Sequence, residues 1–326
     1  LTVSSAASDV YKRQEYLWVK EGSAGLSEFM SYGESQHLEE RANSWTQNST
    51  TSLRWWDGRT SDMGSSFLFL SYLSDKLGGS TGIQQLISDP SLGGNGIENL
   101  ARNPGPGSTP IGLTMSEIFA NFSAAITVDS DQGAFGFSEI DLLDDCSSGG
   151  FCRNIASAEN NDWTEAWQSF GHSLEGWGLK SFRFSGGDGY PLSILVQPDR
   201  FGFEGAVLSK EDSTGTWSMD RLRIDSEDGR GTGLVNGFGN LTSEVWLLVW
   251  YNSLVDDCDF DFANCGVLSG GNYPTGSFSV SASQVTDSAE LTIETVEGFD
   301  RDGDLMDDSV EIGTVSYTHL RAHETS

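Results

Sequence analysis

The sequence predicts an α+β protein in which a helical region precedes an antiparallel β-sandwich. Two observations support this prediction. Apolar residues recur every three to four positions from residue 15 to about 128, whereas after about residue 164 they form short β-prone runs separated by Gly, Asp, Ser or Pro. The chain has 326 residues, more than one typical domain, so we expect two domains.

The helical region is assigned to residues 15–145. One of its helices has apolar residues at helical spacing and is closed by the pair Gly78-Gly79; these residues are Met63, Phe67, Leu70, Leu73 and Leu77. Thr114 and Glu117 form a capping box that predicts the start of another helix. The chain then becomes rich in Asp, Gly, Ser and Asn, and residues 146–163 are expected to be a linker loop.

The sandwich is assigned to residues 164–297. Its strands are predicted from the runs FRF, LSILVQ, GAVLS, WSMDRLRI, SEVWLLVWY, GSFSVSAS and ELTIETV, at the spacing of an antiparallel sandwich. The run SEVWLLVWY is apolar almost throughout, which predicts a central strand buried on both faces.

The two ends of the chain match something other than a natural protein. Residues 4–14, SSAASDVYKRQ, match the translation of a transposon-based sequencing adapter, and residues 315–326, VSYTHLRAHETS, match the opposite adapter. Such scars do not belong in an argument about the fold. We therefore expect residues 1–14 and 315–326 to be artefacts, and residues 15–314 to be an interior piece of a longer protein.

The charge excludes two classes of partner. The formal net charge is −30, with 18 Lys and Arg against 48 Asp and Glu. Binding to nucleic acid or to an anionic membrane needs clustered Lys and Arg, so neither is expected. No run of 18 apolar residues exists, and no membrane span is expected. The charge suits a secreted protein in salty, calcium-containing water, although solubility alone explains it equally well.

Four cysteines form two close pairs, each in a loop rich in Gly, Ser or Asp. They are Cys146 with Cys152, and Cys258 with Cys265. Two local disulfides in an oxidising compartment are expected, which places the protein outside the cell or on its surface. A zinc knuckle is the alternative, but it needs C-x-x-C spacing and further ligands nearby.

The stretch WVKEGSAGLSEF contains a candidate metal ligand. On a helix, Trp18 and Glu21 lie three residues apart on one side, and Gly22 permits close approach of a neighbouring backbone. A carboxylate held in this way can complete a zinc site whose other two protein ligands are histidines one helical turn apart. A solvated glutamate is the alternative interpretation of Glu21.

These residues and those that follow resemble the gluzincin zinc peptidases, in particular hyicolysin-like secreted metallopeptidases. In that family a late helix supplies the third zinc ligand within a pattern like N-E-G-x-A; here Lys20 takes the place of the Asn. The resemblance continues through WWDGRTSDMGSSFLFLSYLSDKLGG, IQQLISDPSLGGNGIENL and IFANFSAAITVDSDQGAFGFSEIDL, and covers about residues 15–143. The chain departs from the family at a frequent Tyr, replaced by Met63 or Phe67, and at a Trp, replaced by Phe122.

The resemblance implies the C-terminal half of a catalytic domain with Glu21 as zinc ligand and a peptide or protein as substrate. The H-E-x-x-H helix of such enzymes precedes the glutamate helix, and no H-E-x-x-H occurs in the sequence. The chain as printed is therefore expected to be inactive. His37 is expected on an exposed helix or loop and His172 in a turn, and neither is expected to bind metal. Glu28 could support the site from the second shell of ligands, but an ordinary exposed glutamate is the simpler interpretation.

A calcium-binding linker is predicted at residues 298–314. The stretch FDRDGDLMDDSVEIGT has oxygen ligands at EF-hand spacing, and it resembles the repeats of thrombospondin type 3. The ligands are the side chains of Asp300, Asp302, Asp304, Asp308 and Glu311 and the carbonyl of Met306. Leu305 replaces the usual Gly at the sixth position, and a merely acidic linker is the alternative.

The leading functional hypothesis is therefore a piece of a secreted zinc endopeptidase with an accessory sandwich and a calcium-binding linker. The alternative is a non-enzymatic extracellular module whose sandwich binds glycans or other surface material. Trp177, Tyr190 and Trp217 could form a sugar-binding platform, but we expect at least two of them in the core.

Overall fold

The computed structural model describes residues 15–56, 58–130, 133–154, 159–163, 166–252, 258–259 and 275–285, with only the backbone at 159–163 and 258–259. The chain divides into two units, Leu1–Gln284 and Val285–Ser326, and the description below concerns the first unit. Both adapter-like ends, the calcium-like stretch and the run ELTIETV lie outside the described residues.

The expected helical region is present. Its helices are α2 (Leu17–Tyr32), α3 (Gln36–Thr46), α4 (Thr60–Lys76), α5 (Gly79–Ser88), α6 (Gly93–Arg102) and α7 (Met115–Val128). The predicted capping box is confirmed, because the amide of Thr114 donates to Glu117 and the amide of Glu117 donates to the Thr114 hydroxyl, at 3.0 and 3.3 Å. No helix in this part of the chain is both long enough and apolar enough to cross a membrane.

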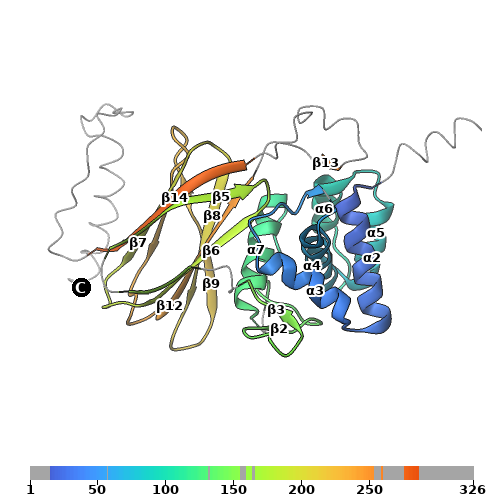
Figure 1. Ribbon diagram of the computed structural model, residues 1–326, viewed down its shortest axis with the longest axis horizontal. Helices are drawn as coiled ribbons and strands as arrows, with labels where there is room; N and C mark the ends of the chain where they lie inside the picture. The colour runs from blue at the N-terminus through green and yellow to red at the C-terminus, as the bar shows by residue number, and fades with distance from the viewer. Residues whose placement is uncertain are drawn as a thin grey trace, which may run out of the picture. The chain divides into compact units, whose positions relative to one another are not determined.

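Helix α4 is the central helix of this region, which Figure 1 shows among the other helices. Nearly all of its side chains are buried, including those of Phe67, Leu70 and Leu73, because apolar residues occur on every side of it. Helices α2 and α3 both pack against it. A Cβ atom at Gly64 would overlap the carbonyl oxygen of Arg41, so α3 crosses α4 with the two backbones in contact.

Two five-stranded sheets follow the helices. The first has the order β10-β11-β7-β14-β5 and the second the order β4-β6-β12-β8-β9. Their strands are β4 (Glu159–Trp163), β5 (Trp167–Glu175), β6 (Leu179–Gly186), β7 (Leu192–Pro198), β8 (Phe203–Lys210), β9 (Trp217–Arg221), β10 (Arg223–Ile224), β11 (Gly231–Val235), β12 (Glu244–Tyr251) and β14 (Thr275–Gln284). The predicted antiparallel pairing is confirmed in both sheets, except that β4 runs parallel to β6.

Strand β12 is central and buried on both faces, as the run SEVWLLVWY predicts. Because side chains alternate along a strand, its two faces serve two different cores. Val245, Leu247 and Val249 face the first sheet and complete the interior of the sandwich. Trp246 and Trp250 face the other way and belong to the same hydrophobic core as the helices.

Helix α7 covers this outer face of the second sheet. The ring of Phe119 on α7 meets the rings of Trp177 and Trp250 edge-on, at centroid distances of 5.5 and 6.2 Å. Within the first unit, the second sheet thus lies between the first sheet and the helices, and one core is continuous from the helices into the sheet.

Several sequence predictions were wrong in detail. His172 lies in strand β5 and not in a turn. The strand continues through a bulge beside His172, where Gly171 adopts φ 78°, a conformation that favours glycine. Because glycine is also common in turns, the sequence suggested a turn at this position. Strands β5 and β11 were not predicted, since Gly, Ser and His interrupt their apolar patterns. Part of the expected linker loop forms strand β4 and the short strand β3 (Phe151–Cys152), which pairs with β2 (Leu142–Leu143).

A disulfide joins Cys146 to Cys152, with 5.5 Å between the two Cα atoms, which confirms the first predicted pair. The segment that carries it follows α7, where Asp129 adopts φ 39° at the end of the helix. The Asp129 carboxylate accepts backbone hydrogen bonds from Phe137 and Leu142, at 3.0 and 2.9 Å. The disulfide segment is thereby folded back towards the end of α7.

Candidate functional site

Helix α2 carries the candidate zinc ligand and is held against α4 by direct backbone contact. A Cβ atom at Gly22 would lie only 2.6 Å from the carbonyl oxygen of Ser66, so the expectation that Gly22 permits close approach is confirmed. Trp18, on the same buried side, is fully buried and lies 6.0 Å from Phe69 between ring centroids. The buried face of α2 is therefore fixed in both position and rotation.

Glu21 lies on α2, as predicted, and its side chain is exposed, whereas Trp18, expected on the same side of the helix, is fully buried. It shares an exposed side of the helix with Ala24, three residues later, and with Ser31, about two turns beyond Ala24. Its carboxylate makes no hydrogen bond or ion pair with any described residue. The carboxylate is thus available to a ligand on the side of α2 that α4 does not cover.

The described residues do not contain a complete metal site, since no group of three or more His, Cys, Asp or Glu among them could hold a metal ion. His37 is exposed on α3, as expected. His172 contacts Ser169 at 2.8 Å and lies against Phe182 and Phe278 in the sandwich. Neither histidine lies on α2, and the assignment of Glu21 as a zinc ligand stays a prediction.

Glu28, the other acidic residue of α2, has a local structural role. Its carboxylate accepts a hydrogen bond from the hydroxyl of Ser35, at 3.2 Å. Ser35 is the residue that caps α3 by accepting from the amide of Leu38, at 3.3 Å. Glu28 therefore helps to fix the turn between α2 and α3.

The predicted calcium site and the second predicted disulfide involve residues outside the described part of the chain. The calcium ligands Asp300, Asp302, Asp304, Met306, Asp308 and Glu311 lie outside the described residues. For the second cysteine pair, the structure describes only the backbone of Cys258, which begins β13 (Cys258–Asp259) beside β1 (Trp55–Trp56), and Cys265 lies outside the described residues.

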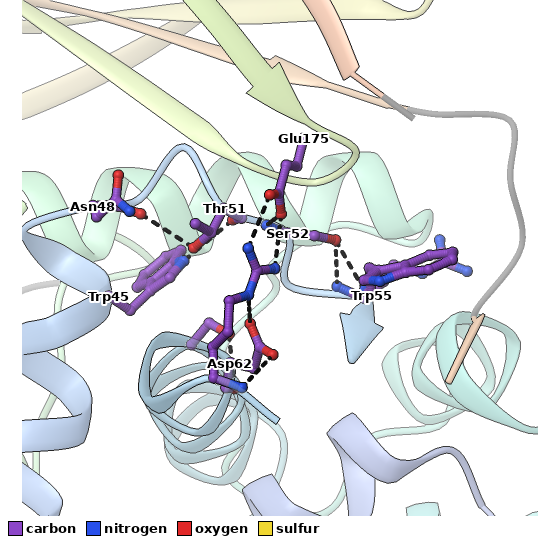
Figure 2. A network of polar contacts seen from close by, with 10 residues as sticks. Trp45, Asn48, Thr51, Ser52, Trp55, Asp62 and Glu175 are labelled. Atoms are coloured by element: carbon purple, nitrogen blue, oxygen red, sulfur yellow. Dashed lines mark hydrogen bonds and ion pairs between the residues drawn. The ribbon is translucent and has the colours of Figure 1, made fainter. Parts of the chain in front are cut away.

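A polar network joins the start of α4 to the end of β5 (Figure 2). The Arg59 guanidinium donates two parallel hydrogen bonds to the Glu175 carboxylate, both of 2.9 Å, and a third to Asp62 at 3.1 Å. Glu175 also accepts from the backbone amide of Ser52, at 2.8 Å. Charge-assisted pairs with this forked geometry are strong and directional. The network ties the helical region to the sandwich, and the sequence offered no pattern that connects residues this far apart.

The three aromatic residues considered for sugar binding have different environments. Trp177 is a core residue with 3% exposure and is the one of the three that is buried, although at least two were expected in the core. Tyr190 is exposed, and Trp217 is half-buried beside Lys210, whose Nζ lies 5.7 Å from the centre of the indole ring. These positions do not form one platform of three exposed rings.

The structure also contains a hollow of about 390 Å³ that the sequence did not predict. It lies where α7 ends, and its lining includes Arg153, Arg183, Lys210, Trp217, Glu244 and Trp246. These residues come from separate strands and from the disulfide segment, so no local motif unites them. The sequence contained one indication of the hollow. Glu244 lies two positions before Trp246 on β12, so both side chains are on the same face of the second sheet, and that face becomes polar at the end of the strand.

No protein-family model matches the sequence, and a search of curated proteins finds no match. Among solved structures, the pre-peptidase C-terminal domain of collagenase from Bacillus anthracis is similar at 12% identity and a TM-score of 0.25, over 38% of this chain and 93% of that one. The g-type lysozyme inhibitor PliG from Aeromonas hydrophila gives 10% identity and a TM-score of 0.23, over 39% and 95%. The surface-associated copper-binding protein CorA of Methylomicrobium album BG8 gives 10% and 0.24, over 40% and 98%. At these TM-scores the similarities identify neither a family nor a function.

Proposed function

We propose that the helical region is the C-terminal part of the catalytic domain of a secreted zinc-dependent endopeptidase, in which Glu21 is the third protein ligand of the zinc. The sandwich is then an accessory domain of the same protein. The exposed carboxylate of Glu21, on a helix that is otherwise packed against α4, is compatible with this role and equally with a solvated glutamate. The proposal rests on the motif WVKEGSAGLSEF and on the resemblance of the residues after it to zinc peptidases, which indicate zinc as the metal.

In this proposal the chain supplies one of the three protein ligands of the zinc. Zinc bound by two histidines and a glutamate keeps one position for water and lowers the pKa of that water to about 7. Glu21 would supply one negatively charged oxygen ligand, and Gly22 and Trp18 would hold its helix at a fixed distance from the other ligands. Two histidines and a general-base glutamate must come from residues outside the printed sequence. The printed chain by itself should neither hold catalytic zinc nor cleave peptides.

Secretion belongs to the same proposal. The Cys146–Cys152 disulfide fits an oxidising compartment, and a net charge of −30 fits a protein that stays soluble in salty water. Calcium at residues 300–311 would suit the same environment, since extracellular calcium modules bind at about millimolar concentrations.

The first test is genomic, because the proposal requires an H-E-x-x-H element upstream of Glu15 in the parent gene. The second test uses the chain extended to include that element. Glu21→Gln should lower bound zinc, measured by atomic absorption, and abolish hydrolysis of casein, since an amide is a poorer zinc ligand than a carboxylate. The matched control is Glu34→Gln, an exposed acid just after α2, which should keep both properties.

A parent gene without H-E-x-x-H would remove the peptidase proposal and leave the alternative, a non-enzymatic extracellular β-sandwich module. Equal zinc content in the two variants would remove the assignment of Glu21 even if the enzyme class held.

A further inference from the structure

The hollow at the end of α7 lies on the sandwich, away from the exposed side of α2, and is independent of the zinc proposal. It is formed on the face of the second sheet that α7 covers elsewhere. Arg153 closes one side by donating to the carbonyl oxygens of Thr127 and Val128 in the last turn of α7, at 3.4 and 3.1 Å. The sheet thus provides the floor of the hollow, and the end of the helix provides a wall.

The strand register explains why the floor is polar. Glu244 on β12 is paired with Lys210 on β8, and Lys210 is paired with Trp217 on β9, so these three side chains form one row across the sheet. The neighbouring row on the same face contains Arg183, paired with Trp246. Since α7 ends at Val128, the row of Glu244, Lys210 and Trp217 is only partly buried, whereas Trp246 in the neighbouring row is still buried.

The charges of the hollow leave one cation without a counter-ion among the described residues. Arg153 forms an ion pair with Asp144, and Arg183 forms one with Glu244, at 3.0 Å between Nε and Oε1. Lys210 forms no ion pair or hydrogen bond through its side chain within the described part of the chain; its ammonium group lies over the ring of Trp217.

This concentration of cations runs against the overall charge. Three of the 18 Lys and Arg residues of a chain with net charge −30 line this single hollow. A protein this acidic repels anions over most of its surface, so an anion can be held only where cations are gathered. The hollow offers such a place for a carboxylate, with the Lys210 ammonium as its partner.

The other groups in the hollow narrow the chemistry of the ligand. Glu244 and Asp144 still offer acceptor oxygens, because a carboxylate accepts about four hydrogen bonds, and hydroxyl groups are suitable donors to them. The ring of Trp217 adds an apolar surface that is half-exposed. A volume of about 390 Å³ is at the lower end of small-ligand sites. A sugar unit that carries both hydroxyls and a carboxylate meets these requirements together.

We propose that this hollow binds a uronic-acid unit of an acidic saccharide, with the carboxylate on Lys210, hydroxyls on Glu244 and Asp144, and the sugar ring against Trp217. An acidic peptide offers a carboxylate but lacks the hydroxyl donors that Glu244 and Asp144 could accept from. A neutral saccharide offers the hydroxyls but leaves Lys210 without its counter-ion.

The test is calorimetric titration of the full chain with trigalacturonate, with uncharged galactotriose and with a triglutamate peptide. Trigalacturonate should bind at least tenfold more tightly than either of the other two. Lys210→Met should weaken trigalacturonate binding by about tenfold, the loss expected for one charge-assisted contact. The matched control is Lys180→Met, because Lys180 also lies over an aromatic ring of the second sheet, that of Phe182 at 5.8 Å, but does not line the hollow. Its affinity should stay within twofold of the wild type.

Trp217→Leu provides a second, uncharged probe and should also weaken binding, while circular dichroism checks that each variant is folded. Absence of trigalacturonate binding at millimolar concentrations would overturn the proposal. So would equal losses in the Lys210 and Lys180 variants, or binding of triglutamate as tight as that of trigalacturonate.

Discussion

Arg59 and Glu175 form a two-pronged ion pair that connects the residue before α4 to the last residue of β5, 116 positions later. The two side chains are 30% and 17% exposed, so the pair is partly shielded from water. Because Glu175 also accepts from the amide of Ser52, one carboxylate holds three segments together. The placement of α4 beside the end of β5 is therefore supported by a contact between residues that are distant in sequence.

We expect Arg59→Met to lower the free energy of unfolding by about 1–2 kcal/mol, because it leaves a half-buried carboxylate with fewer donors. Urea unfolding of this variant, of Glu175→Gln and of the double variant gives the coupling between them. Arg102→Met is the control, since its ion pair with Glu98 is an exposed pair within one helix and should contribute less than about 0.5 kcal/mol. A coupling energy near zero between Arg59 and Glu175 would contradict the role assigned to this pair.

Gly22→Ala should destabilise the chain by about 1–3 kcal/mol, because the added methyl group would lie 2.6 Å from the carbonyl oxygen of Ser66 and must push α2 away from α4. Ser27→Ala on the exposed side of α2 should change stability by less than about 0.5 kcal/mol. Thermal unfolding of both variants measures the difference. If the two variants melted together, the contact between α2 and α4 would have to be looser than described.

Glu117 should make stability depend on pH in a defined direction. The backbone amides of Leu113 and Thr114 donate to its carboxylate and hold the pKa of Glu117 below its ordinary value of 4.5. A lowered pKa in the folded state means that the carboxylate contributes stability above the unfolded pKa and loses it as the pH falls through the folded pKa. Wild type should therefore be more stable than Glu117→Gln at pH 7, and the difference should shrink below about pH 4.5. Urea unfolding at pH 7 and pH 3 checks this, and a difference that grew in acid would show the sign to be wrong.

Calcium should bind at residues 300–311 if the EF-hand spacing is functional. Asp302→Ala combined with Glu311→Ala should abolish binding in calorimetric titration, because it removes two of the five side-chain ligands. Asp307→Ala is the matched control, since Asp307 occupies the eighth position of the loop, which supplies no ligand. Lack of binding by the wild type at millimolar calcium would leave residues 298–314 as a merely acidic linker.

The sequence by itself determined the features that depend on neighbours along the chain. Thr114 and Glu117 cap α7 because the two groups need only the three-residue spacing of a helix start. A glycine, Gly78, follows α4 because the backbone there adopts φ 104°, a left-handed conformation that favours glycine. The unbroken apolar run of β12 predicted a strand buried on both sides, and the close pair Cys146 and Cys152 predicted its own disulfide.

Only the tertiary structure decided which distant residues meet. The alternation of β12 showed that the strand has two faces, but the register with β8 and β9 was needed to place Glu244, Lys210 and Trp217 in one row. Likewise, the motif WVKEGSAGLSEF could place Glu21 on a helix, whereas the exposure of its side chain follows from the contact of Gly22 with α4. Local patterns fix the conformation of a segment because they act through bonds and turns a few residues long. Pairing between strands and packing between helices also join segments tens of residues apart, such as Lys210 with Glu244 and Gly22 with Ser66, and no short pattern specifies them.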